Sequence, residues 1–202
     1  MKNIYLEYLK YVLEHKKNVM KVCFKKGQYI HGITHDLSKF GFEEFVPYAQ
    51  WFYGKYGVKL KKEHPELLLD EKSETYKEHI RIKEEMEKAW KHHYMHNKHH
   101  WDYWVYDDNG EELPCPKEMD INSIEYMISD WDAMSIKFGG SSLDFYFKNR
   151  NQIKLNHNTR VILEYKLGLI NDNLYFDSTT FDQICEAYNL DPNKEYEKIK
   201  KK

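Results

Sequence analysis

The chain has 202 residues and a formal net charge of −2, with 41% hydrophobic and 32% charged residues. This length can bury a sizeable core, so we expect a soluble protein of one domain, or one domain with an appendage. The small net charge gives no strong nucleic-acid signal. No run approaches the ~18 apolar residues of a membrane span, and the first residues lack the apolar segment of a signal peptide. We therefore expect a cytoplasmic protein without a membrane partner.

Cysteine usage points in the same direction. Cys23, Cys115 and Cys185 lie far apart, and no CxxC motif is present. An odd number of isolated cysteines indicates a reducing compartment and argues against a cysteine zinc site.

Hydrophobic periodicity predicts helices along most of the chain and gives no persuasive strand, so the expected fold class is all-α. The predicted helices cover residues 3–26, 43–56, 73–97, about 121–138, 141–151, 156–170 and 181–190. The connections are a short helix or turn over 28–40, a surface excursion over 58–70, a loop over 98–117 and a turn over 171–178. The Lys-rich end, 194–202, is expected to be a solvated helix end or a frayed tail. We divide the chain into a metal-binding helical domain, 1–140, and a helical extension packed on it, 141–202.

Histidine is unusually frequent, because five of the 11 histidines lie within nine positions. These five are His92, His93, His96, His99 and His100. His93 lies near the centre of the apolar stripe of the 73–97 helix, whereas His92 points to its Lys- and Glu-rich side. The alternative for this cluster is a solvated basic patch. His15 falls within the apolar arc of the 3–26 helix, as either a hydrogen-bonded core histidine or a metal ligand.

A doublet, His35-Asp36, is followed three residues later by Lys39. Alone, the doublet could simply belong to a helix cap. Much later, Asp130 and Asp132 flank opposite edges of an apolar helix stripe, and periodicity slightly favours Asp130 as the inward carboxylate. Imidazole and carboxylate groups together suit Fe, Mn, Co, Ni or Zn.

The inward ligand candidates can be combined into one or two metal sites. They are His15, His35, Asp36, His93, His99, His100 and Asp130. A histidine from one helix, the doublet and a late aspartate would hold one ion. Adding His93 with His99 or His100 would allow a second ion, with Asp36 bridging the two.

The order His15, His35-Asp36, Asp130 on an all-α chain resembles the HD superfamily of metal-dependent phosphohydrolases. The run His35-Asp36-Leu37-Ser38-Lys39 is similar to its His-Asp-x-x-Lys variant, and the extra histidines look like its binuclear branch. More closely, four stretches together resemble an uncharacterised bacterial and phage family of unknown function over roughly residues 10–140: HDLSKF, EEFVPYAQWF, AWKHHYMHNKHHWDYW and MISDWDAMS. The run HHYMHNKHH is denser than the superfamily needs, and the tail after Gly140 matches neither group.

The resemblance implies a role for each candidate. The primary ligands would be His15, His35, Asp36 and Asp130, and the second site would use His93, His99 and His100. Lys39 would bind an anionic substrate group or pair with Asp36, the alternative being an ordinary surface lysine. The implied reaction is hydrolysis of a small phosphomonoester or phosphodiester, such as a nucleotide, by metal-activated water.

Three aromatic residues after the histidine cluster, Trp101, Tyr103 and Trp104, could stack on a base or could equally anchor their loop to the core. Other functions stay open as well. They are a di-iron oxygenase on the same ligands, a non-enzymatic metal-binding protein, and a purely structural bundle whose histidines are scattered in space. The aromatic content is also compatible with a homodimer.

Overall fold

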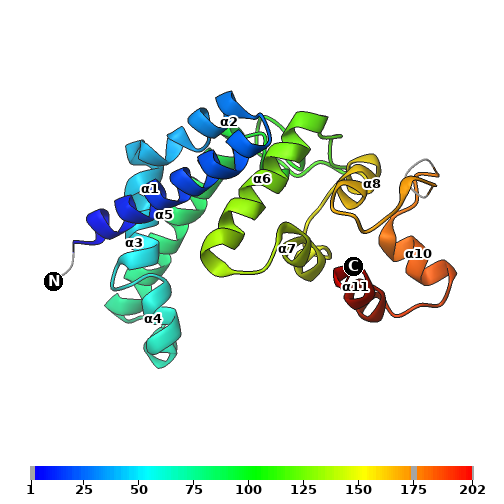
Figure 1. Cartoon of the computed structure of the whole chain (residues 1–202). Coiled ribbons are helices and arrows are strands. Elements are labelled where there is room, and N and C mark those ends of the chain that lie inside the picture. Colours follow the sequence, from blue (N-terminus) through cyan, green and yellow to red (C-terminus); the bar gives the residue numbers. More distant parts are fainter. Residues whose placement is uncertain (1–2, 174–176, 202) are drawn as a thin grey trace. The chain divides into compact units, whose positions relative to one another are not determined.

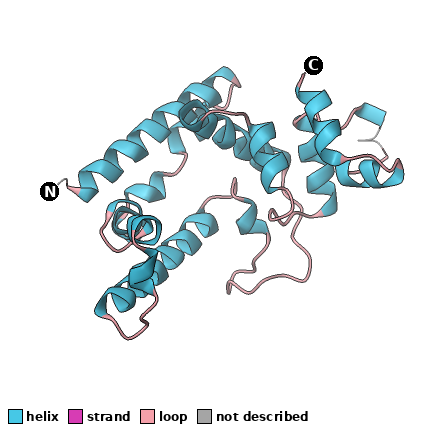
Figure 2. Ribbon diagram, turned by 90° about the horizontal axis from the view of Figure 1, so that it is seen from below, coloured by secondary structure: helices cyan, strands magenta, loops and turns pink. Residues whose placement is uncertain are grey.

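The computed structural model describes residues 3–173 and 177–201, which form helices joined by turns (Figure 1). None of these described residues forms a strand, and their only paired extended residues make an isolated β-bridge between Tyr106 and Glu112 (Figure 2). The all-α prediction is therefore confirmed. None of the described helices is long and apolar enough to cross a membrane.

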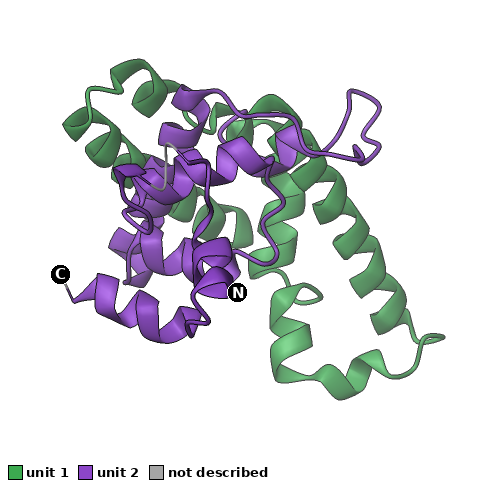
Figure 3. Cartoon of the chain, turned by 90° about the vertical axis from the view of Figure 1, so that its right-hand side faces the viewer, with its two compact units in different colours: residues 1–97 green, residues 98–202 purple. Residues whose placement is uncertain are grey.

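Two compact units make up the chain, unit 1 (Met1–Asn97) and unit 2 (Lys98–Lys202), coloured separately in Figure 3. The boundary between these units differs from the division at residue 140 expected from the sequence. That division into a metal-binding domain and an extension stays a prediction. The predicted turn over 171–178 includes residues 174–176, which lie outside the described residues.

Unit 1 carries the predicted doublet on a short connection between long helices. Its elements are α1 (Ile4–Lys25), α2 (Tyr29–Thr34), η1 (Leu37–Phe40), α3 (Phe42–Tyr53), α4 (Val58–Glu63), η2 (Pro65–Leu68) and α5 (Glu74–His96). Helix α3 packs against both α1 and α5, and α2 packs against α1. Asn3 caps α1 and Ser73 caps α5 through side-chain oxygens that accept backbone N–H bonds.

The core of unit 1 comes from the inward faces of the three long helices. Tyr8, Val12, Tyr48, Ala49 and Ala89 form its buried cluster. Burying such side chains stabilises the unit by roughly 1.5–3 kcal/mol for each large residue. This packing fixes the faces of α1 and α5 on which the candidate ligands His15 and His93 lie.

Helix α3 ends at Tyr53, three residues before the predicted end. A Cβ on Gly54 would lie 2.3 Å from the Gln50 carbonyl oxygen, and one on Gly57 would lie 1.9 Å from that of Trp51. Both positions therefore require glycine, and the chain turns between them. The short α4 then occupies part of the predicted surface excursion.

Unit 2 begins with a one-turn 3-10 helix, which is followed by one helix of 18 residues and then by helices of ten residues or fewer. Its elements are η3 (Trp101–Trp104), α6 (Ile121–Phe138), α7 (Ser142–Asn149), α8 (His157–Lys166), α10 (Phe181–Ala187) and α11 (Pro192–Lys200). Asp120 caps α6, with its Oδ1 accepting from the Ser123 N–H at 2.9 Å. The core of unit 2 includes Ile124, Met127 and Leu163.

Of the two readings of the Lys-rich end, the solvated helix end is the one observed, because α11 covers Pro192–Lys200. The prediction that the last helix is the one at 181–190 is wrong. In α11, Tyr196 is buried and its ring stacks on Phe147, with 3.9 Å between centroids and 4° between planes. The lysines of α11 remain at the surface, as Lys198 shows with a 69% exposed side chain. The charged residues around Tyr196 gave no indication in the sequence that this one side chain is buried.

Candidate metal centre

Four predicted ligands converge inside unit 1 from separate segments of the chain. His15 lies in the middle of α1, between the buried Val12 and Val19, and is itself buried. His93 lies near the end of α5 and has no exposed side-chain surface. His35 and Asp36 form the turn between α2 and η1, and both are buried.

The Asp36 carboxylate lies between two sets of imidazole nitrogens. Its Oδ2 is 3.3 Å from His35 Nε2 and 3.6 Å from His15 Nε2. Its Oδ1 is 3.4 Å from His93 Nε2. The Nε2 atoms of His15 and His35 are 3.3 Å apart. The structural-bundle alternative required these histidines to be scattered, and within unit 1 they are not.

These spacings suit a transition metal ion. Ligand atoms held about 2.1 Å from one ion are separated by roughly 3.0–3.4 Å in octahedral or tetrahedral arrangements. The observed separations of 3.3–3.6 Å fall at or just beyond that range. Nitrogen and carboxylate donors are also the ligands that Zn, Fe, Mn, Co and Ni accept. The residues of unit 1 therefore fit the predicted metal.

Asp36 has a left-handed backbone conformation, with φ 54° and ψ 29°. Aspartate and asparagine adopt this region more readily than most residues, yet it remains uncommon outside glycine. Lys16 supports the turn, because its Nζ donates to the carbonyl oxygens of Ile33 at 2.5 Å and His35 at 2.6 Å. An uncommon backbone conformation held by the surrounding structure is typical of functional sites.

Lys39 and the imidazoles around Asp36 keep its carboxylate ionised. Burial alone raises the pKa of Asp36, but His35, Lys39 and His93 outweigh it and hold the pKa well below its ordinary value. Lys39 Nζ lies 2.5 Å from Asp36 Oδ2, and its side chain is 17% exposed. Of the predicted roles for Lys39, the structure shows the pairing with Asp36.

The contacts that His31 and Glu44 make with the candidate ligand histidines were not predicted from the sequence. His35 Nδ1 lies 3.1 Å from His31 Nε2, one turn earlier on α2. His93 Nδ1 lies 2.8 Å from Oε2 of Glu44, a fully buried residue of α3. The i,i+4 spacing of His31 and His35 could have indicated the first contact. Nothing local distinguishes Glu44 from the exposed Glu43 beside it.

Glu44 also binds the histidine that periodicity placed on the polar side of α5. His92 Nδ1 is 2.8 Å from Glu44 Oε1, and His92 Nε2 is 2.7 Å from Glu43 Oε2. Burial raises the pKa of Glu44, but hydrogen bonds from His93 and His92, together with the electrostatic effect of the nearby His93 ring, lower it below its ordinary value. His92 therefore contacts two carboxylates on α3.

The remaining residues with predicted roles belong to unit 2. They are His99, His100, Trp101, Trp104 and Asp130. Trp101 and Trp104 pack against the core of unit 2, and Trp104 Nε1 donates to the Lys98 carbonyl at 2.8 Å. This packing agrees with the alternative in which the aromatics anchor their loop. The ligand roles of His99, His100 and Asp130 stay predictions.

The model of a family of unknown function (DUF5662) matches residues 5–169 of the chain. The chain belongs to this family. The match extends the predicted resemblance, 10–140, at both ends, and it includes every residue with a predicted role in this DUF5662 member. It ends before α10 and α11. No curated protein and no solved structure matches the chain significantly.

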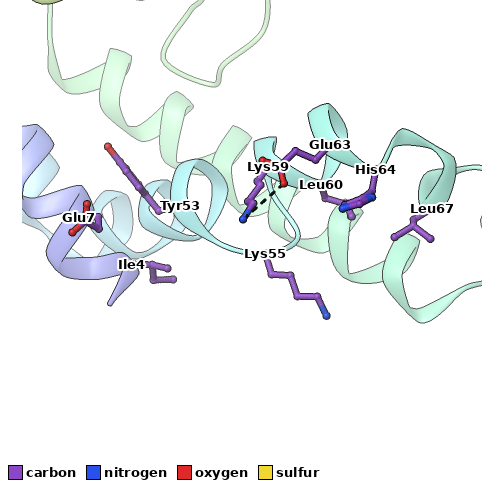
Figure 4. Close-up of a pocket in the computed structure, with 9 residues that line it drawn as sticks. All are labelled: Ile4, Glu7, Tyr53, Lys55, Lys59, Leu60, Glu63, His64 and Leu67. Atoms are coloured by element: carbon purple, nitrogen blue, oxygen red, sulfur yellow. Dashed lines mark ion pairs between the residues drawn. The ribbon is translucent and has the colours of Figure 1, made fainter. Parts of the chain in front are cut away.

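A pocket of about 830 Å³ lies on unit 1 of this DUF5662 protein (Figure 4). Its apolar lining includes Ile4, Tyr53 and Leu60, and the Lys59–Glu63 ion pair, at 3.8 Å, belongs to its polar lining. None of the predicted ligands lines it. The candidate metal centre is therefore defined by its converging side chains and not by this pocket.

Proposed function

We propose that this protein is a metal-dependent phosphohydrolase of the HD type, acting on a small phosphomonoester or phosphodiester. The observation that carries the proposal is the position of Asp36. Its two carboxylate oxygens lie near different imidazoles, His15 and His35 on one side and His93 on the other. This arrangement suits a carboxylate shared by two ions.

Each residue of the centre has a distinct part in this proposal. His15, His35, Asp36 and His93 hold the metal, and the ion supplies positive charge and a water of lowered pKa as the nucleophile. Lys39 carries a fixed positive charge to the edge of the site, where it binds a phosphoryl oxygen and stabilises the negative charge that develops during hydrolysis. Asp36 holds the Lys39 ammonium at that position.

His99, His100 and Asp130 are proposed as additional ligands, on the sequence pattern alone. Trp101 and Trp104 are partly buried against the core of unit 2, and we propose that the accessible part of their rings binds a nucleobase. Alanine variants of His99, His100 and Asp130, each analysed for bound metal, test the ligand assignments one by one.

The hydrolase proposal is tested with protein prepared without a His-tag, stripped by a chelator and reloaded separately with Mn, Fe, Co, Ni or Zn. We expect metal-dependent release of product from p-nitrophenyl phosphate, bis(p-nitrophenyl) phosphate or a panel of nucleotides. Asp36→Asn should abolish this release, whereas the exposed Asp108→Asn should not.

Two results would contradict hydrolysis in different ways. Oxygen consumption by the iron-loaded protein, with an iron EPR signal and no phosphate release, would identify an oxygenase on the same ligands. Stable metal binding with no turnover on the whole panel would indicate a metal-binding protein without phosphohydrolase activity.

A further inference from the structure

Glu44 is a fully buried carboxylate at a place where acidic residues ordinarily face water. It lies in the first turn of α3, beside Glu43, whose side chain is 75% exposed. Negative charge in a first turn is favourable at the surface, but a buried carboxylate is costly unless hydrogen bonds compensate it. Both oxygens of Glu44 have such bonds, to His92 Nδ1 and His93 Nδ1 at 2.8 Å each.

The contact with Glu44 selects the protonated nitrogen of the His93 ring. A carboxylate can only accept, so the 2.8 Å contact places a proton on His93 Nδ1. Ser38 Oγ and Asn97 Nδ2 also approach this nitrogen, but at 3.2 and 3.3 Å. Asn97 Nδ2 donates instead to the His93 carbonyl at 2.7 Å. Charge-assisted bonds are roughly twice as strong as neutral ones, so the contact with Glu44 prevails.

In the neutral ring, a proton on Nδ1 leaves the other nitrogen, Nε2, facing the metal centre with its lone pair available. His93 Nε2 lies 3.4 Å from Asp36 Oδ1. If the proton were on Nε2, this nitrogen could not serve as a ligand. The choice of tautomer at His93 therefore decides whether α5 contributes to the centre.

We propose that Glu44 is a positioning residue of the metal centre, which acts through His93. It fixes the orientation of the His93 ring and its Nδ1–H tautomer, and so presents Nε2 as a ligand atom. This inference rests on the proposed metal centre. Outer carboxylate partners of ligand histidines typically contribute about 10–100-fold to metal affinity.

The first measurement reads the His93 tautomer directly in the metal-free protein, by long-range ¹H–¹⁵N NMR, with His93→Gln to assign the ring. We expect the Nδ1–H form in the wild type and in Glu43→Gln, which changes the neighbouring exposed carboxylate. Glu44→Ala should lose the preference for that form. A His93 ring with its proton on Nε2 in the wild type would overturn the inference.

The second measurement is the metal dissociation constant, from competition with a chelator of known affinity. Glu44→Ala should weaken binding about 10–100-fold, and Glu43→Gln should leave it unchanged. Glu44→Gln keeps the side-chain volume and serves if the alanine variant does not fold; it should also weaken binding. Wild-type affinity in every folded Glu44 variant would contradict the proposal.

The two measurements separate the inference from the function on which it rests. The tautomer is read without metal and without substrate, so it reports on Glu44 even if no phosphoester is hydrolysed. A wild type that binds metal but hydrolyses nothing would remove the proposed reaction and leave the role of Glu44 intact.

Discussion

Lys16→Met removes the cation that supports the turn at Asp36, while keeping most of the apolar stem of the side chain. Lys16 Nζ donates to two carbonyl oxygens, those of Ile33 and His35. Hydrogen bonds from a charged group contribute about 1.5–3 kcal/mol each, which sets an upper limit of roughly 3–6 kcal/mol. The Ile33 carbonyl lies at the surface and can bind water in the variant, and Lys16 no longer has to be desolvated. We therefore expect a loss of about 2 kcal/mol.

Urea denaturation of the metal-free protein measures this loss. With a slope of about 2 kcal/mol per molar urea, the midpoint should fall by about 1 M. Metal affinity should fall as well, because the left-handed backbone at Asp36 becomes one of several conformations. Lys17→Met is the matched control, since Lys17 is the adjacent lysine of α1 and is exposed. Equal midpoints for Lys16→Met and Lys17→Met would refute the reasoning.

Two further variants address charge at each unit. Lys39→Met should retain bound metal but lower kcat/KM for a phosphoester by roughly 100-fold, because removing one group that stabilises a developing oxyanion usually has an effect of this size. An unchanged kcat/KM would show that Lys39 only forms an ion pair with Asp36. In unit 2, burial raises the pKa of Glu164, against the lowering effect of bonds from Tyr146 and Phe181. A carboxyl whose pKa is higher in the folded protein than in the unfolded chain stabilises the fold fully while the pH is below its pKa in the unfolded chain, about 4.3. This contribution is lost as the pH rises through its pKa in the folded protein. The unfolding free energy of the wild type should therefore fall relative to that of Glu164→Gln between about pH 4 and neutrality. Urea denaturation across this pH range measures the difference, and a difference that stays constant would contradict the reasoning.

The periodicity of apolar residues was sufficient to predict which side chains of the long helices are buried. It placed His15 and His93 on the inward sides of α1 and α5, where the structure buries both. It also predicted the start of α5 to within one residue, and in the structure Ser73 precedes this helix and caps it. The ends of these helices follow from local chemistry that the sequence displays.

Contacts between residues far apart in the chain, and unusual backbone conformations, could not be predicted from periodicity. Glu44 has the same residue type and the same helix position, the first turn, as Glu43, and only the packing of α3 on α5 makes one buried and the other exposed. The carbonyl oxygen just before the left-handed Asp36 accepts from Lys16, which lies 20 residues earlier than Asp36. Tyr196 is a single aromatic residue in a charged segment, and its partner Phe147 is remote in sequence.

The most direct test of the proposed metal centre is the metal content of tag-free protein, measured by inductively coupled plasma mass spectrometry in the wild type and in Asp36→Asn. Asparagine tolerates the left-handed backbone, so the substitution removes the charge of the central ligand without removing its shape. We predict one or two equivalents of a divalent transition metal in the wild type and a background level in the variant. Equal metal content in the two proteins, or none in the wild type after incubation with each candidate ion, would contradict the account.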